Sequence, residues 1–493
     1  MTEARPPQTL LELLLPDGRA DRSAVLGSAC PPRLRPPSTS GDGEAPLDLI
    51  LLAPDDAESR RPGWLAQAAA TCAARLSDDG LAYVLVSPRR RRRISSLLRD
   101  EGLRTELAIV HLPDWDESRH LVSLEAAAAR SAFSSIVPLR PWKRRLAAVV
   151  LGLRGAGLIA AVHGPVALAA RRPGARAPLS WLGSFAGAEA RGRGAVLSCS
   201  WRPSGPRVVA YLAAAGAGPP VVAKVALDGE AGRGPASEGA RLRRLGPAAR
   251  RAGAAVPEPL ADTELRGSAL LVETRLEGRV LAPLLADRPQ DLKVVIRDMH
   301  AWLLRWQRSA AVPAALTRAR LEREVLAPAE ELGPRLRGGP SYLAALAVRC
   351  AAAEGTMAPL TPSHNDLTMW NVLVGPGRAL GVVDWESAEE ATLPFRDFPY
   401  AVVDAVSAVT RYRNRPAAAR ACFELGGEHA ASVLAMSEAL ARAVGAPPEA
   451  VELSLHACWL GHALNESRTR RAGDPAPFAE IAQWLADREA TAS

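Results

Sequence analysis

One pair of segments constrains this chain more than any other part of it. Ser363–Val374 reads SHNDLTMWNVLV, and Ala379–Glu386 reads ALGVVDWE. The first segment places Asp366 and Asn371 five positions apart on a loop that leads into an apolar strand. The second segment is an apolar strand that ends at Asp384, and a Gly-Pro-Gly turn lies between the two strands. We therefore expect three oxygen-bearing side chains to converge at the end of a short hairpin.

These three side chains match the chemistry of phosphoryl transfer. One carboxylate can accept the proton of a hydroxyl group, while an amide and a second carboxylate can hold Mg²⁺. The whole chain has only four asparagines, and two of them, Asn365 and Asn371, lie in this loop. The alternative is an ordinary hairpin with incidental polar residues. The spacing of these residues disfavours this alternative, because the same spacing occurs in the catalytic loop and metal-binding aspartate of kinases.

HNDLTMWN followed by VVDWE resembles the catalytic core of the aminoglycoside phosphotransferase and choline kinase group, a branch of the protein-kinase-like fold. The resemblance covers about residues 190–490. It implies that Asp366 orients and deprotonates an acceptor hydroxyl, that Asn371 and Asp384 bind magnesium, and that His364 supports the loop. The family usually has glycine where Asn365 stands, and we expect this difference to alter the loop geometry slightly.

The nucleotide-binding lobe of such a fold is expected upstream. Val221–Ala226, VVAKVA, predicts an apolar strand with Lys224 at its centre, where an ammonium group is costly unless it meets an anion. The resemblance implies that Lys224 contacts the α and β phosphates of ATP and pairs with Glu238 on the next helix. Glu230 is the competing partner. An edge-strand lysine that points to solvent is the alternative for Lys224.

Two further segments complete the expected nucleotide site. Strands at Ala195–Cys199 and Arg207–Leu212 are joined by SWRPSGP, whose Ser204 and Gly205 are expected to cover the phosphates although the turn has a single glycine. The strand Ala269–Thr274 leads into the hinge between the lobes. There the resemblance implies adenine contacts within Glu273–Leu276, and we name Glu273, Thr274 and Leu276 as the binding residues.

The rest of the kinase-like part is expected to be helical. In the helix Leu292–Arg308, Trp302 and Trp306 form a core stripe. Asp397 follows the second strand at the distance where the family has a further aspartate, which implies that it braces the catalytic loop. The C-terminal helices are expected on the substrate side. Several of their side chains either face one cleft or belong to an ordinary amphipathic helix: Glu452, His456, Trp459, His462 and Glu466.

The N-terminal part predicts an α/β domain. Strands alternate with helices at 47–53, 64–76, 81–86, 91–100 and 105–111, a pattern typical of a parallel sheet with covering helices. Over about residues 45–130 this order resembles the later half of a class I methyltransferase, which binds S-adenosylmethionine. Gly27 with Ser28 does not replace the glycine-rich turn that holds the cofactor in that family. We expect an incomplete, Rossmann-like methyltransferase domain without cofactor that serves as a scaffold or interaction surface.

The predicted domains are 1–164 for the methyltransferase-like part, 165–193 for a linker, and 194–493 for the kinase-like part, with lobes 194–275 and 276–493. The apolar stretch 146–170 is interrupted by Arg154, His163 and Pro165, so a buried or interdomain helix pair is favoured over membrane contact. Six scattered cysteines without a CxxC pair, and a start without a signal pattern, indicate a cytoplasmic protein.

The formal net charge of +8 comes almost entirely from arginine, since the chain has only three lysines. We attribute it to coding bias, and no nucleic-acid partner is expected. The sequence therefore predicts a kinase that transfers the γ-phosphoryl group of MgATP to a hydroxyl of a sugar, amino alcohol or aminoglycoside-like acceptor. Two alternatives remain: a protein related to S-adenosylmethionine-dependent methyltransferases, and a non-catalytic nucleotide-binding scaffold.

Overall fold

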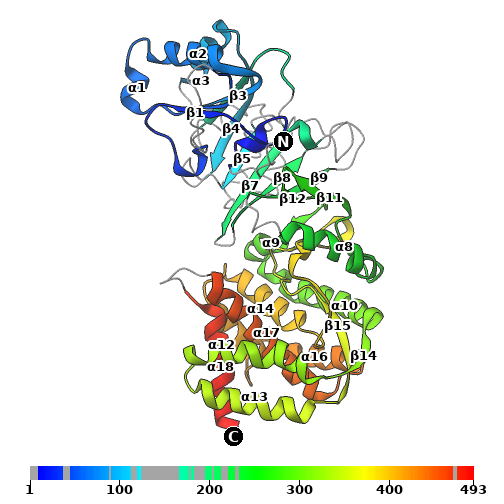
Figure 1. Ribbon diagram of the computed structural model, residues 1–493. Coiled ribbons are helices and arrows are strands. Elements are labelled where there is room, and N and C mark those ends of the chain that lie inside the picture. Colours follow the sequence, from blue (N-terminus) through cyan, green and yellow to red (C-terminus); the bar gives the residue numbers. More distant parts are fainter. Residues whose placement is uncertain are drawn as a thin grey trace. The chain divides into compact units, whose positions relative to one another are not determined.

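The computed structural model divides the chain into two compact units, each of which is described by itself (Figure 1). The first unit comprises residues 1–239 and 259–275, and the second comprises 240–258 and 276–493. The structure describes residues 9–36, 45–87, 90–112, 119–123, 166–176, 179–182, 195–202, 205–212, 220–227, 233–469 and 475–492.

The first unit is built on one sheet of eleven strands, in the order β1-β2-β3-β6-β4-β5-β7-β8-β9-β12-β11. The strands are β1 (Ser23–Leu26), β2 (Leu47–Leu52), β3 (Leu76–Val86), β4 (Arg104–Leu112), β5 (His120–Ser123), β6 (Val166–Arg171), β7 (Ala195–Arg202), β8 (Gly205–Leu212), β9 (Val221–Ala226), β11 (Pro259–Leu265) and β12 (Ser268–Thr274). The strands β1, β2 and β3 are parallel, and every later neighbour in the sheet pairs antiparallel.

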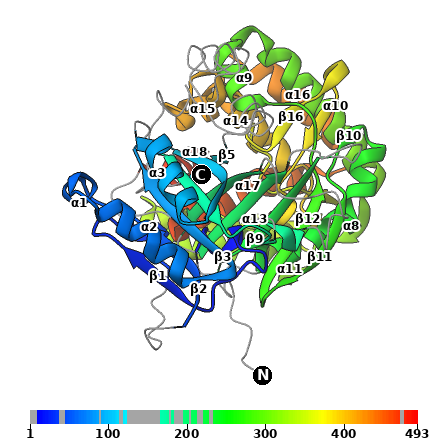
Figure 2. The ribbon, with the colours of Figure 1, turned by 90° about the horizontal axis from the view of Figure 1, so that it is seen from above.

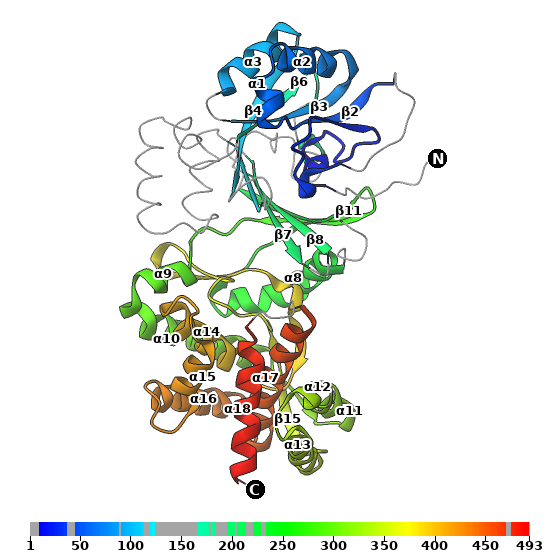
Figure 3. The ribbon, with the colours of Figure 1, turned by 90° about the vertical axis from the view of Figure 1, so that its left-hand side faces the viewer.

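Among the described helices of the first unit, α2 (Trp64–Arg75) and α3 (Arg91–Asp100) cover one face of its parallel strands, and α1 (Asp56–Arg60) contacts α2 (Figure 3). The helix α1 begins with a capping box in which the side chains of Asp55 and Glu58 bond reciprocally to each other's backbone amides. The apolar faces of α2 and α3 pack on strand residues of β2 and β3, which explains the alternation of apolar runs and amphipathic segments in the sequence.

The opposite face of the sheet carries a second core that runs from one end of the sheet toward the other. The N-terminal segment Leu10–Leu15 is buried throughout, with every leucine at most 3% exposed. Its leucines share a core cluster with side chains of β2 and β3 and also with Leu265, Leu270 and Val272 of β11 and β12. The first unit is therefore held together by one continuous apolar layer.

The structure corrects the predicted domain boundaries. Residues 165–193 were expected to form a linker, but β6 (Val166–Arg171) lies inside the sheet between β3 and β4, and all six of its residues are buried. The strand β5 pairs with β7, so the sheet of the α/β part continues into the strands expected for the nucleotide-binding lobe. The sequence also gave no sign of β1, whose four residues are too short a run to stand out from a coil segment.

The second unit is mostly helical. One helix, α8 (Arg233–Arg251), begins in the first unit and continues into the second. The helices that follow are α9 (Leu281–Asp287), α10 (Leu292–Ala310), α11 (Arg318–Leu321), α12 (Ala327–Leu332), α13 (Gly339–Ala353), α14 (Asp397–Val409), α15 (Arg415–Phe423), α16 (Ala430–Val444), α17 (Pro448–Thr469) and α18 (Pro477–Ala492). Two small sheets, β10-β17-β16-β13 and β14-β15-β18, lie among them. Their strands are β10 (Ala254–Ala255), β13 (Arg279–Val280), β14 (Val312–Ala315), β15 (Met357–Ser363), β16 (Val372–Val374), β17 (Leu380–Val382) and β18 (Glu389–Thr392).

Helix α10 packs against α14 and α16 (Figure 2). Its Trp302 and Trp306 are 1% and 0% exposed and stack on each other at 5.1 Å, which confirms the predicted core stripe. Trp306 meets the ring of Trp385 edge-on at 5.5 Å. The tryptophan that follows Asp384 is thereby anchored in the core, and it fixes the end of β17.

The apolar stretch 146–170 is described only in part. Residues 166–170 belong to β6, whereas residues 146–165 lie outside the described residues. Among the helices that the structure describes, none is both long enough and apolar enough to cross a membrane.

Candidate functional site

A hairpin of β16 and β17 brings the two expected metal ligands to the same end of a small sheet. Val372 pairs with Val382, and the amide of Val383 donates a hydrogen bond to the carbonyl oxygen of Asn371 at 3.0 Å. Asp384 is therefore one residue beyond the partner of Asn371. Its backbone has a left-handed conformation with φ of 67°, which aspartate tolerates better than most residues and which is common at functional sites.

Asp366 is held by neutral hydrogen-bond donors at both carboxylate oxygens. The side-chain amide of Asn371 donates to Oδ2 at 3.0 Å and to the carbonyl oxygen of Asp366 at 2.9 Å. The hydroxyl of Tyr400 donates to Oδ1 at 3.3 Å. Because the amide nitrogen of Asn371 is used in this way, its amide oxygen is the atom left to bind a cation. An amide oxygen and the carboxylate of Asp384 are the kind of ligands that Mg²⁺ takes.

Asp397 holds the start of the catalytic loop, as the sequence predicted. Its Oδ1 accepts from the Ser363 hydroxyl and from the amide of Asn365, both at 2.8 Å. Its Oδ2 accepts from the amide of His364 at 2.7 Å. The ring of His364 is fully buried against Trp385, with Nε2 3.1 Å from the carbonyl oxygen of Val383. His364 thus ties this loop to the strand that carries Asp384.

Asn365 keeps the backbone conformation of the glycine that it replaces. Its φ is 61°, a left-handed value that glycine adopts freely and asparagine better than most side chains. The nitrogen of its side-chain amide also donates to the carbonyl oxygen of Ser387 at 3.0 Å and to the carboxylate of Glu389 at 2.9 Å. The side chain of Asn365 therefore connects the loop to the segment after Asp384.

A second buried aspartate, Asp404, braces the far end of the loop and was missed from the sequence. Its Oδ1 accepts from the amide of Met369 at 2.7 Å and from the Tyr412 hydroxyl at 3.0 Å. Its Oδ2 pairs with Arg415 at 2.6 Å. Burial raises the pKa of Asp404, and Arg415 and the hydrogen bonds act against this rise. Only its spacing of seven residues from Asp397, two turns of one helix, could have indicated it.

In the first unit, Lys224 forms the predicted ion pair. Its Nζ lies 2.6 Å from Oε1 of Glu238, and the Lys224 side chain is 15% exposed. A second carboxylate, that of Glu273, lies 3.0 Å from the same nitrogen. Both glutamates are nearly fully buried, and each pairs with the ammonium of this lysine. The ammonium is thus held inward on β9, which excludes the solvent-facing alternative.

The structure bears on one of the expected adenine contacts, that of Glu273. Glu273 was predicted to meet adenine, but its backbone pairs with Val222 on one side and Pro259 on the other, and its carboxylate faces Lys224. Its place inside the sheet argues against that role. Thr274 ends β12, and Leu276 follows in the second unit, where it lies against Gly381. The loop between β7 and β8 is only two residues long; Ser204 lies outside the described residues, and Gly205 begins β8.

The polar and aromatic residues of α17 do not face one cleft. Arg349 lies among Glu452 and His456 of α17 and Glu489 of α18. It pairs with Glu452 at 2.7 Å and with Glu489 at 2.8 Å. The three residues have the composition of a metal site, but the guanidinium already supplies the positive charge there. His456 also hydrogen-bonds Tyr342 at 2.7 Å through Nδ1. We regard this group as a structural ion-pair network.

Other residues of α17 serve packing and capping. Trp459 and His462 pack around the ring of Tyr400. Glu466 accepts from the amides of Phe478 and Ala479 at the start of α18. The amphipathic-helix alternative therefore describes α17 better than a substrate cleft does.

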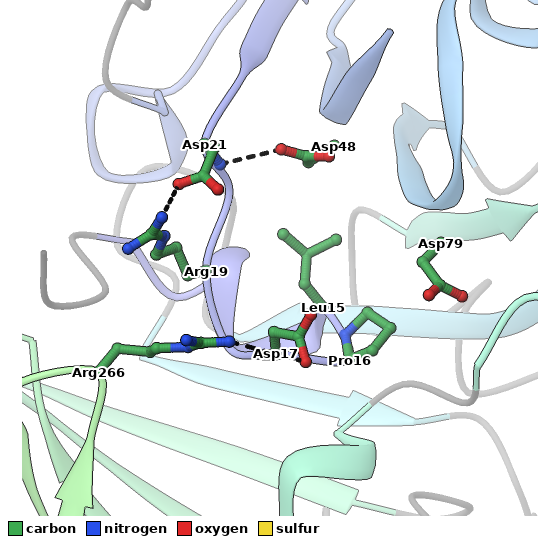
Figure 4. A pocket seen from close by; sticks show the side chains of 8 residues that line it. All are labelled: Leu15, Pro16, Asp17, Arg19, Asp21, Asp48, Asp79 and Arg266. Carbon is green, nitrogen blue, oxygen red and sulfur yellow. Dashed lines mark hydrogen bonds and ion pairs between the residues drawn. The ribbon is translucent and has the colours of Figure 1, made fainter. Parts of the chain in front are cut away.

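A polar pocket of about 230 Å³ lies in the first unit (Figure 4). Its lining comprises Leu15, Pro16, Asp17, Arg19, Asp21, Asp48, Asp79 and Arg266. Asp17 pairs with Arg266 at 3.9 Å, and Asp48 accepts from the amide of Asp21 at 3.0 Å. Arg176 bridges Asp17 and Asp79 at 2.8 and 2.7 Å. The carboxylates of this pocket thus pair with arginines and backbone amides of the chain. The pair of Asp17 and Arg266 connects the N-terminal segment to the turn between β11 and β12.

Comparison with known proteins supports the kinase-like part. Residues 204–421 match the family model described as "Phosphotransferase enzyme family". The chain is similar to the crystal structure of aminoglycoside phosphotransferase APH(4)-Ia, with 13% identity, a TM-score of 0.38, and coverage of 60% of this chain and 93% of that one. It is also similar to the GDP and kanamycin complex of an APH(2") enzyme, with 13% identity, a TM-score of 0.35, and coverage of 60% and 91%. No curated protein matches the chain.

The family match includes both Asp366 and the hairpin that leads to Asp384. This protein is an enzyme, a phosphotransferase, and its C-terminal part has the kinase-like fold.

Proposed function

We propose that this enzyme transfers the γ-phosphoryl group of MgATP to a hydroxyl group of a sugar, amino alcohol or aminoglycoside-like acceptor. The observation that carries the proposal is the carboxylate of Asp366, which is fixed by Asn371 and Tyr400 beside the hairpin end that bears Asp384. A carboxylate held in this way can orient a hydroxyl and accept its proton as the bond to phosphorus forms.

The proposed roles divide between the two units. In the second unit, Asp366 accepts the proton, and Asn371 and Asp384 hold magnesium, which when bound neutralises charge on the phosphates. In the first unit, Lys224 binds the α and β phosphates. The pair with Glu238 supports this role, because it holds the ammonium extended at 2.6 Å and keeps it from folding away.

We further propose that the N-terminal part is a methyltransferase-like fold that has lost its cofactor. The strand order supports the resemblance, with parallel β1, β2 and β3 and a reversed strand between β3 and β4. The turn after β1 supports the loss. Ser28 donates to Asp55 at 2.8 Å, and a Cβ on Gly27 would lie 2.4 Å from the carbonyl oxygen of Ala53. The chain itself thus occupies the position where the cofactor-binding turn would open.

The loss of the cofactor site can be tested by calorimetric titration of the whole protein with S-adenosylmethionine. We expect no saturable heat. Micromolar binding would contradict this part of the proposal and would favour the methyltransferase-related alternative.

The transfer itself is tested by a panel of acceptors. Kanamycin, hygromycin B, choline and glucose are each incubated with MgATP and the protein, and both ADP formation and the phosphorylated product are measured. Asp366→Ala is the matched control for contaminating activity. We expect product with at least one acceptor class, and ADP formation that vanishes in the control. A panel without product, or ADP formation equal in the control, would contradict the proposal.

The metal role predicts a separate effect of Asp384→Ala. Removal of a carboxylate ligand weakens the magnesium-dependent part of nucleotide binding, so ATP affinity in the variant should no longer rise with magnesium concentration. Fluorescence titration with a nucleotide analogue across a magnesium series measures this. An unchanged magnesium dependence would assign Asp384 another role.

A further inference from the structure

We propose that Tyr400 is the positioning residue for the catalytic carboxylate, and that the C-terminal helices α17 and α18 act on the reaction through it. This inference rests on the proposed function, because it assumes that Asp366 accepts the acceptor proton. The geometry that carries it is the hydrogen bond of 3.3 Å from the Tyr400 hydroxyl to Oδ1 of Asp366.

Tyr400 supplies the second of the two side-chain donors described above for Asp366. Asn371 donates to Oδ2 and Tyr400 donates to Oδ1, so the two donors act on different oxygens of the same carboxylate. With a donor on each oxygen, the plane of the carboxylate is fixed. A base held in one orientation loses less entropy on reaching the transition state, which raises kcat more than it tightens binding.

The ring of Tyr400 cannot move away easily, because it is enclosed by aromatic side chains. It is 5% exposed and stacks on the imidazole of His462 at 3.6 Å with an angle of 11° between the planes. Trp459 meets it edge-on at 6.2 Å, and Phe478 lies at 5.8 Å. Trp459 and His462 belong to α17, and Phe478 belongs to α18, two helices that run side by side (Figure 3).

Both rings of this stack are neutral. Burial lowers the pKa of His462 to about 3, with Arg396 and Arg415 adding to the effect. Burial raises the pKa of Tyr400 well above its ordinary value, and the negative charges of Asp366 and Asp404 act in the same direction. The phenol therefore keeps its proton throughout the working pH range and remains a donor to Asp366.

The helices α17 and α18 lie wholly beyond residue 421, where the family match ends. Their aromatic side chains nevertheless hold the residue that orients the base. The C-terminal helices thus act on catalysis through their contacts with Tyr400.

The test compares three single variants, and the double variant Tyr400→Phe/His462→Ala, with the wild-type protein, using MgATP and the panel acceptor that gives the highest wild-type turnover. Tyr400→Phe removes the hydroxyl but keeps the stack. His462→Ala removes the ring that holds Tyr400. Tyr342→Phe is the matched control, because it removes the hydroxyl of a buried tyrosine that bonds His456 instead of the catalytic loop. For each variant, kcat, both KM values and the melting temperature are measured.

We expect kcat to fall about tenfold in Tyr400→Phe, with both KM values within about twofold of wild type, since a hydrogen bond to a charged group is lost. Tyr342→Phe should lose comparable stability without a change in kcat. If His462 acts only through Tyr400, the double variant should be no slower than Tyr400→Phe.

Two outcomes would overturn the inference: a Tyr400→Phe kcat within twofold of wild type, or fully additive losses in the double variant. A wild-type protein without turnover would instead overturn the proposed function, so the two failures are distinguishable.

Discussion

At the scale of single residues, the most informative position is Asn365. The sequence suggested that an asparagine in place of glycine would alter the loop slightly. In the structure Asn365 has a left-handed backbone and two side-chain hydrogen bonds to the segment after Asp384. Position 365 therefore has two features: a left-handed backbone, which glycine also adopts, and side-chain hydrogen bonds, which glycine cannot make.

Substitutions of Asn365 separate the contribution of its backbone conformation to stability from that of its side-chain hydrogen bonds. Asn365→Gly keeps the left-handed backbone and loses the side-chain bonds, so we expect a loss of about 1 kcal/mol in stability. Asn365→Val loses the same bonds and must also hold a β-branched residue at positive φ, which adds about 1–2 kcal/mol. Urea unfolding of both variants measures the difference. Equal stabilities would contradict the backbone argument.

At the scale of elements, helix α14 holds the catalytic loop along its length. Asp397, Tyr400 and Asp404 stand at spacings of three and four, which places them on one face of the helix. They bond, in order, the start of the loop, its catalytic carboxylate and the amide of Met369. Side chains of one helix thus hold the loop at three points along its length.

The pair of Asp404 and Arg415 predicts a pH-dependent stability. Arg415→Met leaves a buried carboxylate without a counter-charge, which costs about 3–5 kcal/mol at pH 8. Burial already raises the pKa of Asp404, and the loss of Arg415 raises it further, so the cost shrinks as the carboxyl protonates at lower pH. We therefore expect the variant to be closer to wild type at pH 5 than at pH 8 in urea unfolding.

Arg468→Met is the matched control for this prediction. Arg468 pairs with Glu331 at 2.6 Å, but the two side chains are 61% and 44% exposed. Solvent screens such a pair, so its loss should cost less than about 1 kcal/mol with no trend between pH 5 and pH 8. Equal costs for the two variants would contradict the account of Asp404.

The elements also show where sequence reasoning succeeds. The strand around Lys224, the strand before the hinge and the catalytic hairpin were predicted nearly to the residue, because each has a local apolar run bounded by turn residues. Asp404 and Tyr400 have partners more than thirty residues away and were missed, whereas Asp397, with partners as distant, was predicted only through the family resemblance. Contacts at such separations leave no local pattern in a single sequence.

At the scale of the whole molecule, the unexpected feature is the sheet of the first unit. The sequence predicted two domains with a linker, from the Ala-, Arg-, Gly- and Pro-rich composition of residues 165–193. That composition hid β6, and the pairing of β5 with β7 joins two strands 72 or more positions apart. The nucleotide-binding strands therefore belong to a larger sheet and have no free edge at β7.

This architecture predicts that the kinase-like part does not stand alone. A chain that begins at residue 194 loses β5 from the edge of β7 and removes Leu10–Leu15 from the core that contains Leu270 and Val272. We expect it to aggregate, as measured by size-exclusion chromatography beside the full chain. A monomeric product with wild-type ATP affinity would contradict the shared core.

The most direct test of the central claim compares binding and turnover in Asp366→Ala. We predict that transfer of the γ-phosphoryl group to the panel acceptor falls at least about a hundredfold, while the dissociation constant of MgATP stays within about threefold of wild type. Turnover near the wild-type rate would show that this carboxylate is not the base, and the account of the site would be wrong.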